Sequence, residues 1–154
     1  MERKLTNDDQ AWLTRLAQSA TQIATVLTHV HRIAVIGIKP EAVGGPAFSV
    51  PAYAQAAGLE IVPVPVYYPD VTDILGAPVH RSLVAVIPPA DTVLLFRRSE
   101  HVQRHLDEIL TAQPSVVWMQ SGIRDDAVAE TLARAGIVVV QDRCLKIELA
   151  HRGR

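Results

Sequence analysis

Five short apolar runs rich in β-branched residues recur along this chain, and a stretch suited to a helix or a loop separates each run from the next. The runs are "RIAVIGI", "EIVPVPVYY", "DTVLLFRR", "PSVVWMQSG" and "IVVVQDR". A short run that is apolar throughout is typical of a strand covered on both faces in a parallel sheet. Strands that alternate with helices are joined by right-handed crossovers. The sequence therefore predicts an α/β fold with a Rossmann-like, doubly wound parallel sheet of about five strands.

Helices are expected between these runs. The segment 46–58 predicts one helix, in which Pro51 is tolerated only within the first turn. The segment 99–113 predicts a second helix, with Ser99 as its N-cap. A third helix is expected over residues 124–136, and the chain is expected to finish as a short helix.

An extra helix is expected at the N-terminus. Within residues 8–29, apolar side chains recur at spacings of three, four and seven, the pattern of an amphipathic helix. We therefore divide the chain into an N-terminal helix, residues 1–29, and one domain, residues 30–154. The apolar face of the helix, with Trp12 and Ile23, is expected to cover the domain's own sheet. The alternative is that it docks on a second copy of the chain, as a homodimer, or on another partner.

The composition limits the class of protein. A chain of 154 residues with 49% hydrophobic and 20% charged residues suits one globular domain with a sizeable core. No apolar run approaches the ~20 residues that cross a bilayer, and "MERKLTNDDQ" lacks the apolar region of a signal peptide. We therefore expect a cytoplasmic protein without a membrane partner. The formal net charge of -1 argues against a nucleic-acid partner, since that affinity comes from clustered Lys and Arg.

Neither disulfides nor metal ions are expected to stabilise the fold. Cys144 is the single cysteine, which excludes an internal disulfide framework. The six histidines do not show the spacing of a structural zinc site. His101 and His105 lie four residues apart on a predicted helix, and we interpret them as part of a solvated face. No metal site is predicted.

The fold class predicts where a ligand would bind. In a doubly wound sheet the binding crevice lies at the carboxyl ends of the strands, near the switch in strand order. The residues two and five positions after Gly37 are Lys39 and Ala42, so the dinucleotide fingerprint G-x-G-x-x-G is absent, as is a P-loop. A glycine-proline loop that leads into a helix remains, with Lys39 beside it. Backbone N–H groups and a helix N-terminus are together suited to an anion.

Several motifs resemble those of one known family. They are "RIAVIGIKP", "GPAFSVPAYAQAAGLEIVPV", "DTVLLFRRSEHV", "VVWMQSGI" and "VVVQDRCLKIE". In this order they resemble the small single-domain CoA-binding proteins, the YccU-like family, over about residues 30–149. That family is similar in fold to the CoA-binding domain of the succinyl-CoA synthetase α subunit. The resemblance implies a Rossmann-like fold that holds coenzyme A, with the pyrophosphate near the first glycine turn and the adenine near the loop after the second strand.

Ten residues are candidates for holding the cofactor. The resemblance implies a phosphate turn at Gly37, Ile38 and Lys39, a nucleoside loop at Val64 and Pro65, and a third crevice segment at Phe96 and Arg97. In addition, Ser49 stands near the position of a serine that the family often has at the helix start, where this chain has Ala47. Gln120 and Gly122 are candidates because they follow the fourth predicted strand. The full set is Gly37, Ile38, Lys39, Ser49, Val64, Pro65, Phe96, Arg97, Gln120 and Gly122.

The chain departs from the family pattern after the second strand. The family commonly has "VNP" where this chain has Val64, Pro65 and Val66, so an asparagine contact to the nucleotide is missing. The motifs therefore support recognition of phosphate better than recognition of adenine or ribose.

Other residues near the expected crevice have structural interpretations. Arg98 is expected to face solvent or to pair with Glu100 or Asp91, whereas Arg97 is expected to meet the ligand. Trp118 is expected in the core. Asp142 is expected to bond a backbone amide at the start of the last helix.

Cys144 has two interpretations. It is a small packed residue, or a thiol that forms a mixed disulfide with the thiol of CoA, a reaction that Arg143, Lys146 and a helix N-terminus would favour.

The function expected from the sequence is binding without catalysis. No Ser-His-Asp order or nucleophile elbow is present, so no catalytic residue is named. We predict a protein that binds coenzyme A or an acyl-CoA. One alternative is an enzyme that uses NAD(P) or another nucleotide, in which Arg97 and Arg98 accept a 2′-phosphate. The other is a regulatory protein that acts through its N-terminal helix.

Overall fold

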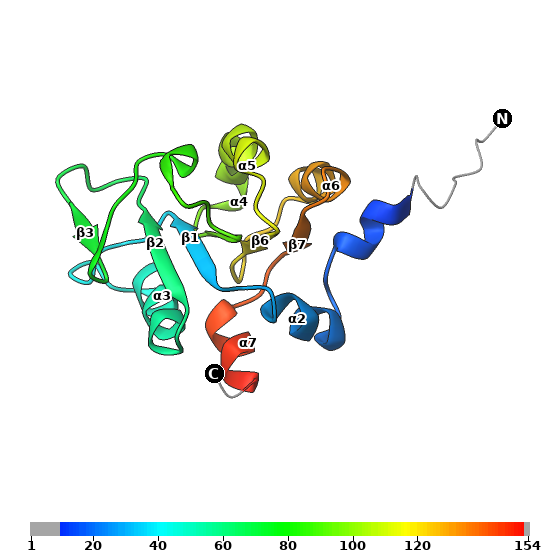
Figure 1. Cartoon of the computed structure of the whole chain (residues 1–154), viewed down its shortest axis with the longest axis horizontal. Coiled ribbons are helices and arrows are strands. Elements are labelled where there is room, and N and C mark those ends of the chain that lie inside the picture. The colour runs from blue at the N-terminus through cyan, green and yellow to red at the C-terminus, as the bar shows by residue number, and fades with distance from the viewer. Residues whose placement is uncertain (1–9, 153–154) are drawn as a thin grey trace.

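The computed structural model describes residues 10–152, and a parallel five-stranded sheet lies at its centre (Figure 1). The strand order is β2-β1-β5-β6-β7, and every neighbouring pair is parallel. The prediction of a doubly wound sheet of about five strands is confirmed. The strands are β1 Arg32–Ile36, β2 Glu60–Val64, β5 Thr92–Leu95, β6 Val116–Met119 and β7 Val138–Val140.

The strand order reverses at β1. The chain passes from β1 to β2 on one side and then returns to place β5 on the other side of β1. The connection from β1 to β2 contains a helix on one face of the sheet, and the later crossovers lie on the opposite face (Figure 1). The carboxyl ends of β1 and β5 therefore flank the switch point, where such sheets bind ligands.

Helices cover both faces of the sheet. In Figure 1, α2, α3 and α7 lie on one face, and α4, α5 and α6 lie on the other. The α-helices are α2 Ala20–Leu27, α3 Pro46–Ala56, α4 Ser99–Val102, α5 Leu106–Ala112, α6 Asp126–Arg134 and α7 Leu145–His151. The 3₁₀ segments are η1 Ala11–Arg15, η2 Leu83–Ala85 and η3 Gln103–His105. A small hairpin, β3 Asp73–Ile74 and β4 Ala77–Pro78, was not expected from the sequence. No helix in the range 10–152 is long and apolar enough to cross a membrane.

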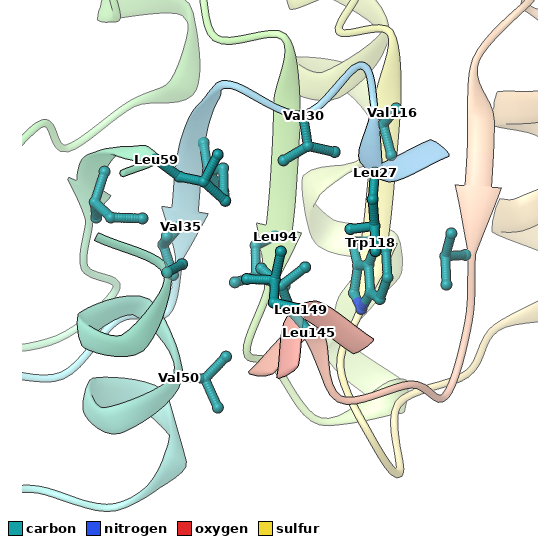
Figure 2. Packing of buried hydrophobic residues seen from close by; sticks show 14 of the residues in the cluster. Leu27, Val30, Val35, Val50, Leu59, Leu94, Val116, Trp118, Leu145 and Leu149 are labelled. Atoms are coloured by element: carbon teal, nitrogen blue, oxygen red, sulfur yellow. The ribbon is translucent and has the colours of Figure 1, made fainter. Parts of the chain in front are cut away.

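Two apolar clusters form the core, one on each face of the sheet. Figure 2 shows the cluster in which α3 and α7 pack on β1, β5 and β6. Trp118 lies in this cluster and is fully buried, and its indole N–H donates to the carbonyl of Arg143 at 2.8 Å. The interpretation of Trp118 as a core residue is confirmed.

The expected N-terminal helix is wrong as a single element. Residues 8 and 9 lie outside the described range, and the chain from Ala11 to Leu27 forms a 3₁₀ segment, a break and a short α-helix. At the break Leu16 forms a parallel bridge with Val139, so the chain joins the edge of the sheet at β7. Ser19 then begins α2 through a capping box with Gln22. Pairing with a distant strand therefore overrides the helical spacing.

The apolar face of this segment covers the domain's own sheet. Ile23, Val26 and Leu27 of α2 are buried in the core cluster on the face of the sheet that α3 and α7 also cover. Trp12 packs on the opposite cluster and lies 4.7 Å from the guanidinium of Arg134. The expectation of packing on the chain's own core is confirmed for these residues.

Ser99 does not cap the helix that it begins. The N-cap position is Arg98, and no side chain caps this end. The Ser99 hydroxyl instead accepts a hydrogen bond from the Arg124 N–H at 3.0 Å. Ser99 therefore ties the loop after β5 to the loop after β6, and the helix behind it is divided into α4, η3 and α5.

Candidate functional site

Gly37 and Phe96 bring together the two loops at the switch point. Gly37 follows β1 with φ of +87°, and a Cβ at this position would lie 2.2 Å from the carbonyl oxygen of Phe96. The backbone N–H of Phe96 in turn donates to Ile36 at 2.9 Å. Only glycine fits both the backbone angle and the space. The carboxyl ends of β1 and β5 therefore meet at the switch point, where the fold class predicts that a ligand binds.

The turn after β1 is held on both sides by backbone hydrogen bonds. The Gly37 N–H donates to Val64 at 3.0 Å, which ties the turn to β2. The Lys39 N–H donates to Ala47 at 3.2 Å, which ties it to the first turn of α3. No residue within 10–152 accepts a hydrogen bond from the Ile38 N–H. Of the three amides of this turn, that of the buried Ile38 is therefore the one without an acceptor in the described chain.

Pro51 explains why a carbonyl of α3 accepts from the turn. It lies inside α3 rather than in the first turn, contrary to expectation. Proline has no N–H, so Pro51 cannot donate to the carbonyl of Ala47, four residues earlier. The Lys39 N–H bonds this carbonyl instead.

The N-terminus of α3 faces this turn without a side-chain cap. Gly45 is the N-cap with φ of 77°, and Pro46 follows at the first helical position. The carbonyl of Gly45 accepts from the Ser49 N–H at 2.9 Å, so Ser49 belongs to the first turn, with an exposed side chain. The side chain of Lys39 is also exposed. An uncapped helix start beside a free lysine attracts anions.

Arg97 is a buried cation at the end of β5. Only 9% of its surface is exposed. Its Nε–H donates to His105 Nε2 at 3.1 Å, and its Nη1 reaches the hydroxyl of Tyr67 at 3.5 Å. The guanidinium carbon also lies 5.8 Å from the centre of the Tyr67 ring. None of the described carboxylates forms an ion pair with Arg97.

The neighbouring Arg98 behaves differently. Its side chain is 84% exposed, and it lies 3.9 Å from Glu100. Asp91, the other partner considered for the two arginines, accepts hydrogen bonds from the backbone N–H groups of His31 and Arg32. The structural interpretation of Arg98 is confirmed, and the two adjacent arginines are separated into a solvated one and a buried one.

His105 corrects the expectation of a solvated histidine face. Its ring is partly buried between Arg97 and Glu108, whose Oε1 lies 2.8 Å from His105 Nδ1. The second oxygen of Glu108 accepts from the Leu83 N–H at 3.2 Å. The sequence signal that could have found this pair is a histidine and an acid three residues apart on the helix behind Arg97. Within the described range no cluster of three or more His, Cys, Asp or Glu is suited to a metal ion.

Two side chains of this region have altered acidity. The hydrogen bond and the positive charge of Arg97 lower the pKa of Tyr67 below its ordinary value. Partial burial lowers the pKa of His101, and the charge of Arg104 acts in the same direction, although Glu100 opposes both. The Nδ1 atom of His101 is buried and has no hydrogen-bond partner within the described chain.

The loop after β6 is tied to the start of α7. Gln120 is 4% exposed, and its side-chain oxygen accepts from the Leu145 N–H at 3.1 Å. The Gly122 N–H donates to Asp142 at 2.6 Å. Asp142 therefore bonds an amide of the β6 loop and not, as expected, one at the last helix's start. The carbonyl group of Gln120 is committed to α7, so this side chain has less freedom to meet a ligand than the sequence suggested.

A hollow of about 370 Å³ lies beyond this loop, between the ends of β6 and β7 and α7. The Cys144 side chain lines it. Its arginines are already engaged: Arg143 pairs with Glu148 at 3.3 Å, and Arg124 pairs with Asp126 at 3.0 Å. These two arginines of the hollow are therefore already paired with carboxylates, unlike Arg97.

The structure brings most candidate residues to the carboxyl ends of the strands. The turn Gly37, Ile38 and Lys39 lies between the end of β2 and the loop with Phe96 and Arg97. Val64 and Pro65, at the end of β2, are buried, and neither has a polar side chain. Tyr67 was missed, because its contact with Arg97 joins loops 30 residues apart in the sequence.

Comparisons with known proteins agree with this architecture. The uncharacterized protein YneT of Bacillus subtilis (strain 168) is 32% identical over 131 residues, which cover 84% of this chain and 93% of that protein. A solved structure from Thermus thermophilus matches with a TM-score of 0.78 at 32% identity, covering 87% of this chain and 98% of that one. A hypothetical protein from Pyrococcus horikoshii OT3 shares the fold, with a TM-score of 0.78 at 22% identity and 98% coverage of both chains. Residues 31–150 match the CoA binding domain family as a whole. The chain therefore belongs to the CoA-binding domain family, as its motifs indicated.

Proposed function

We propose that this protein binds coenzyme A or an acyl-CoA in the crevice at the carboxyl ends of β1 and β5. The observation that carries the proposal is Arg97, a cation with 9% exposure and no carboxylate partner in the described chain. A buried charge is costly unless a group of opposite charge compensates for it. The pyrophosphate of CoA supplies that charge at the point where the fold predicts a ligand.

The turn after β1 supports the same assignment. The Ile38 N–H has no acceptor in the described chain, and the start of α3 beside it has no side-chain cap. Backbone amides and a helix N-terminus bind phosphate without a particular sequence motif, so the missing glycine fingerprint is no obstacle. Lys39 and Ser49, both exposed, can add a charge and a hydroxyl.

The two ends of the cofactor are proposed to follow the edge of the sheet. The adenine end lies toward Val64 and Pro65, where the exposed ring of Tyr67 provides a further apolar surface. The pantetheine end runs toward the loop after β6, past Gln120 and Gly122. Strands are spaced by about 4.8 Å, so β5 and β7 are separated by roughly 10 Å, well within the length of the pantetheine arm.

We propose a binding role in the cytoplasm and no catalysis. The polar groups of the crevice that hold Arg97 are engaged with one another, and none is placed as a nucleophile beside a base. The family assignment supports CoA in preference to a dinucleotide.

Calorimetry tests this proposal directly. Titrations with CoA, dephospho-CoA and NAD, under one buffer and salt condition, are expected to give binding for the first two and little for NAD. Absence of both heat and thermal stabilisation with CoA would overturn the assignment. Tight binding of NAD would instead favour a dinucleotide-dependent enzyme.

A further inference from the structure

A chain of hydrogen bonds leads from the crevice into the protein. It begins at Arg97, passes through the ring of His105 to Glu108, and ends at the backbone N–H of Leu83. The links measure 3.1 Å, 2.8 Å and 3.2 Å. The chain connects the loop after β5 with α5 and η2, so the ring of His105 is held from both sides.

The contact with Arg97 determines the tautomer of His105. A guanidinium Nε–H can only donate, so His105 Nε2 must be the acceptor and carry no proton. The proton of the neutral ring therefore lies on Nδ1, where it donates to Glu108 Oε1. Glu108 accepts this bond and one from the Leu83 N–H, as a carboxylate can.

The same contact orients the guanidinium of Arg97. With Nε directed at His105 and Nη1 directed at Tyr67, the plane of the group is held from two sides. No described residue accepts a hydrogen bond from Nη2. A Cβ at Gly37 would lie 3.4 Å from the Arg97 Cδ, so this part of the side chain adjoins the turn after β1.

We infer that His105, held by Glu108, is a positioning residue that orients the guanidinium of Arg97 toward a bound anion. Binding of the anion then requires the neutral ring of His105. The inference rests on the proposed function, because the anion in question is the pyrophosphate of CoA. Arg97 touches the ligand in this account, and His105 acts through Arg97.

Protonation of His105 breaks the arrangement. It places a second N–H on Nε2, facing the Arg97 Nε–H across 3.1 Å, where neither group can accept. The groups that these hydrogen bonds place against the ring do not offer Arg97 a substitute acceptor, and the nearby His101 on α4 has a pKa lowered by burial and by the charges of Arg104 and Arg97. Glu108 on α5 bonds the far side of the ring, and η2 contributes only the neutral Leu83 N–H. Tyr67 lies on the far side of Arg97, and the chain neighbour Arg104 on η3 adds positive charge.

The test uses dephospho-CoA, which keeps the pyrophosphate and lacks the 3′-phosphate. That choice matters because a phosphate monoester itself takes up a proton near pH 6. Calorimetry of the full chain with dephospho-CoA is carried out from pH 8 to pH 5.5. We expect affinity to fall on the order of tenfold across the range, the loss of one hydrogen bond to a charged group.

Three variants identify the group responsible. His105→Gln retains an acceptor for Arg97 and a donor for Glu108, so it is expected to keep most of the affinity at pH 8 and to lose the pH dependence. His105→Leu removes both bonds and is expected to bind about tenfold more weakly at pH 8. His31→Gln alters an exposed histidine at the opposite end of β1 and is expected to behave as the parent protein.

The outcomes separate this inference from the proposed function. If the parent protein binds neither CoA nor dephospho-CoA at pH 8, both fail. If it binds with the same affinity at pH 8 and pH 5.5, or if His105→Gln keeps the full pH dependence, only the inference fails. A nitrogen NMR spectrum that shows the neutral ring of His105 protonated at Nε2 would also overturn it, whether or not a ligand binds.

Discussion

The carbonyl oxygen of Ala47 accepts a hydrogen bond from the N–H of Lys39 at 3.2 Å, and Pro51 has no N–H with which to compete for it. A proline inside a helix normally weakens the helix by removing a bond of this kind. Here the carbonyl left without its usual partner anchors the turn at the switch point. A local defect of α3 thereby contributes to the shape of the proposed phosphate site.

Replacement of Pro51 by Ala is predicted to loosen that turn. The new N–H competes with Lys39 for the Ala47 carbonyl, so we expect CoA to bind roughly threefold more weakly, with no loss of helix content. Calorimetry and circular dichroism measure the two effects. Pro46→Ala is the matched control, because an N–H at the first helical position has no partner within the helix in any case. Equal affinities of the two variants would contradict this role of Pro51.

Replacement of Gly37 by Ala is predicted to destabilise the whole domain. A Cβ would lie 2.2 Å from the Phe96 carbonyl in addition to the strain of the positive φ, so we expect a loss of about 3 kcal/mol or more in the free energy of unfolding. Gly136→Ala has a similar φ and open space around the new Cβ, so its loss should be about 1 to 2 kcal/mol. Urea unfolding of both variants measures the difference, and equal losses would show that the contact with Phe96 relaxes.

The strands and the strand ends at the switch point could be predicted because both depend on local sequence. Short β-branched runs leave little choice other than buried parallel strands, and the predicted strand positions agree with the structure. The positions of Gly37 and Arg97 followed from the ends of those runs. Their location near the switch point could therefore be predicted without knowledge of any tertiary contact.

Contacts between distant segments could not be predicted in the same way. Leu16 continues a helical spacing in the sequence, yet its backbone pairs with Val139 across the sheet. His105 looks like one of two solvated histidines until η3 is packed against the loop that carries Arg97. In each case tertiary packing determines which residue is the partner, and the periodicity of apolar residues in the sequence does not predict such a contact.

Replacement of Arg97 by Met is predicted to separate binding from stability. Loss of the cation should weaken CoA on the order of 30-fold, as expected for a hydrogen-bonded charge. The ligand-free protein should melt no lower than the parent, because a buried cation without a carboxylate partner is replaced by an apolar side chain of similar length. Calorimetry and thermal melts follow both effects. Arg98→Met, at an exposed position, should change affinity less than about twofold.

If the melting temperature of ligand-free Arg97→Met falls sharply, the charge of Arg97 stabilises the protein without an anion, and the proposed role of this side chain is contradicted. Equal CoA affinity in the Arg97 and Arg98 variants would remove Arg97 from the binding site.

The acidity of Tyr67 reports on the same guanidinium. Arg97 lowers the pKa of Tyr67 through a hydrogen bond and its charge, so the phenol should ionise below its ordinary pH near 10. Arg97→Met is predicted to raise that pKa toward the ordinary value. Absorbance at the phenolate band is compared with that of Tyr67→Phe to isolate one tyrosine. An unchanged titration in Arg97→Met would show that the two side chains are not coupled in solution.

His101 is predicted to make the domain less stable in mild acid. Partial burial and the charge of Arg104 lower its pKa in the folded state, whereas the unfolded chain takes up the proton near the ordinary pH of 6.5. Between these two values the unfolded state binds more protons, so the free energy of unfolding falls as the pH drops below 6.5 and levels off below the folded pKa. Urea unfolding from pH 8 to pH 5 should therefore show a smaller decline in His101→Gln than in the parent. The exposed His29 supplies the control, because His29→Gln should leave the decline unchanged. Parallel curves for the parent and His101→Gln would show that its ring is hydrated in the folded protein.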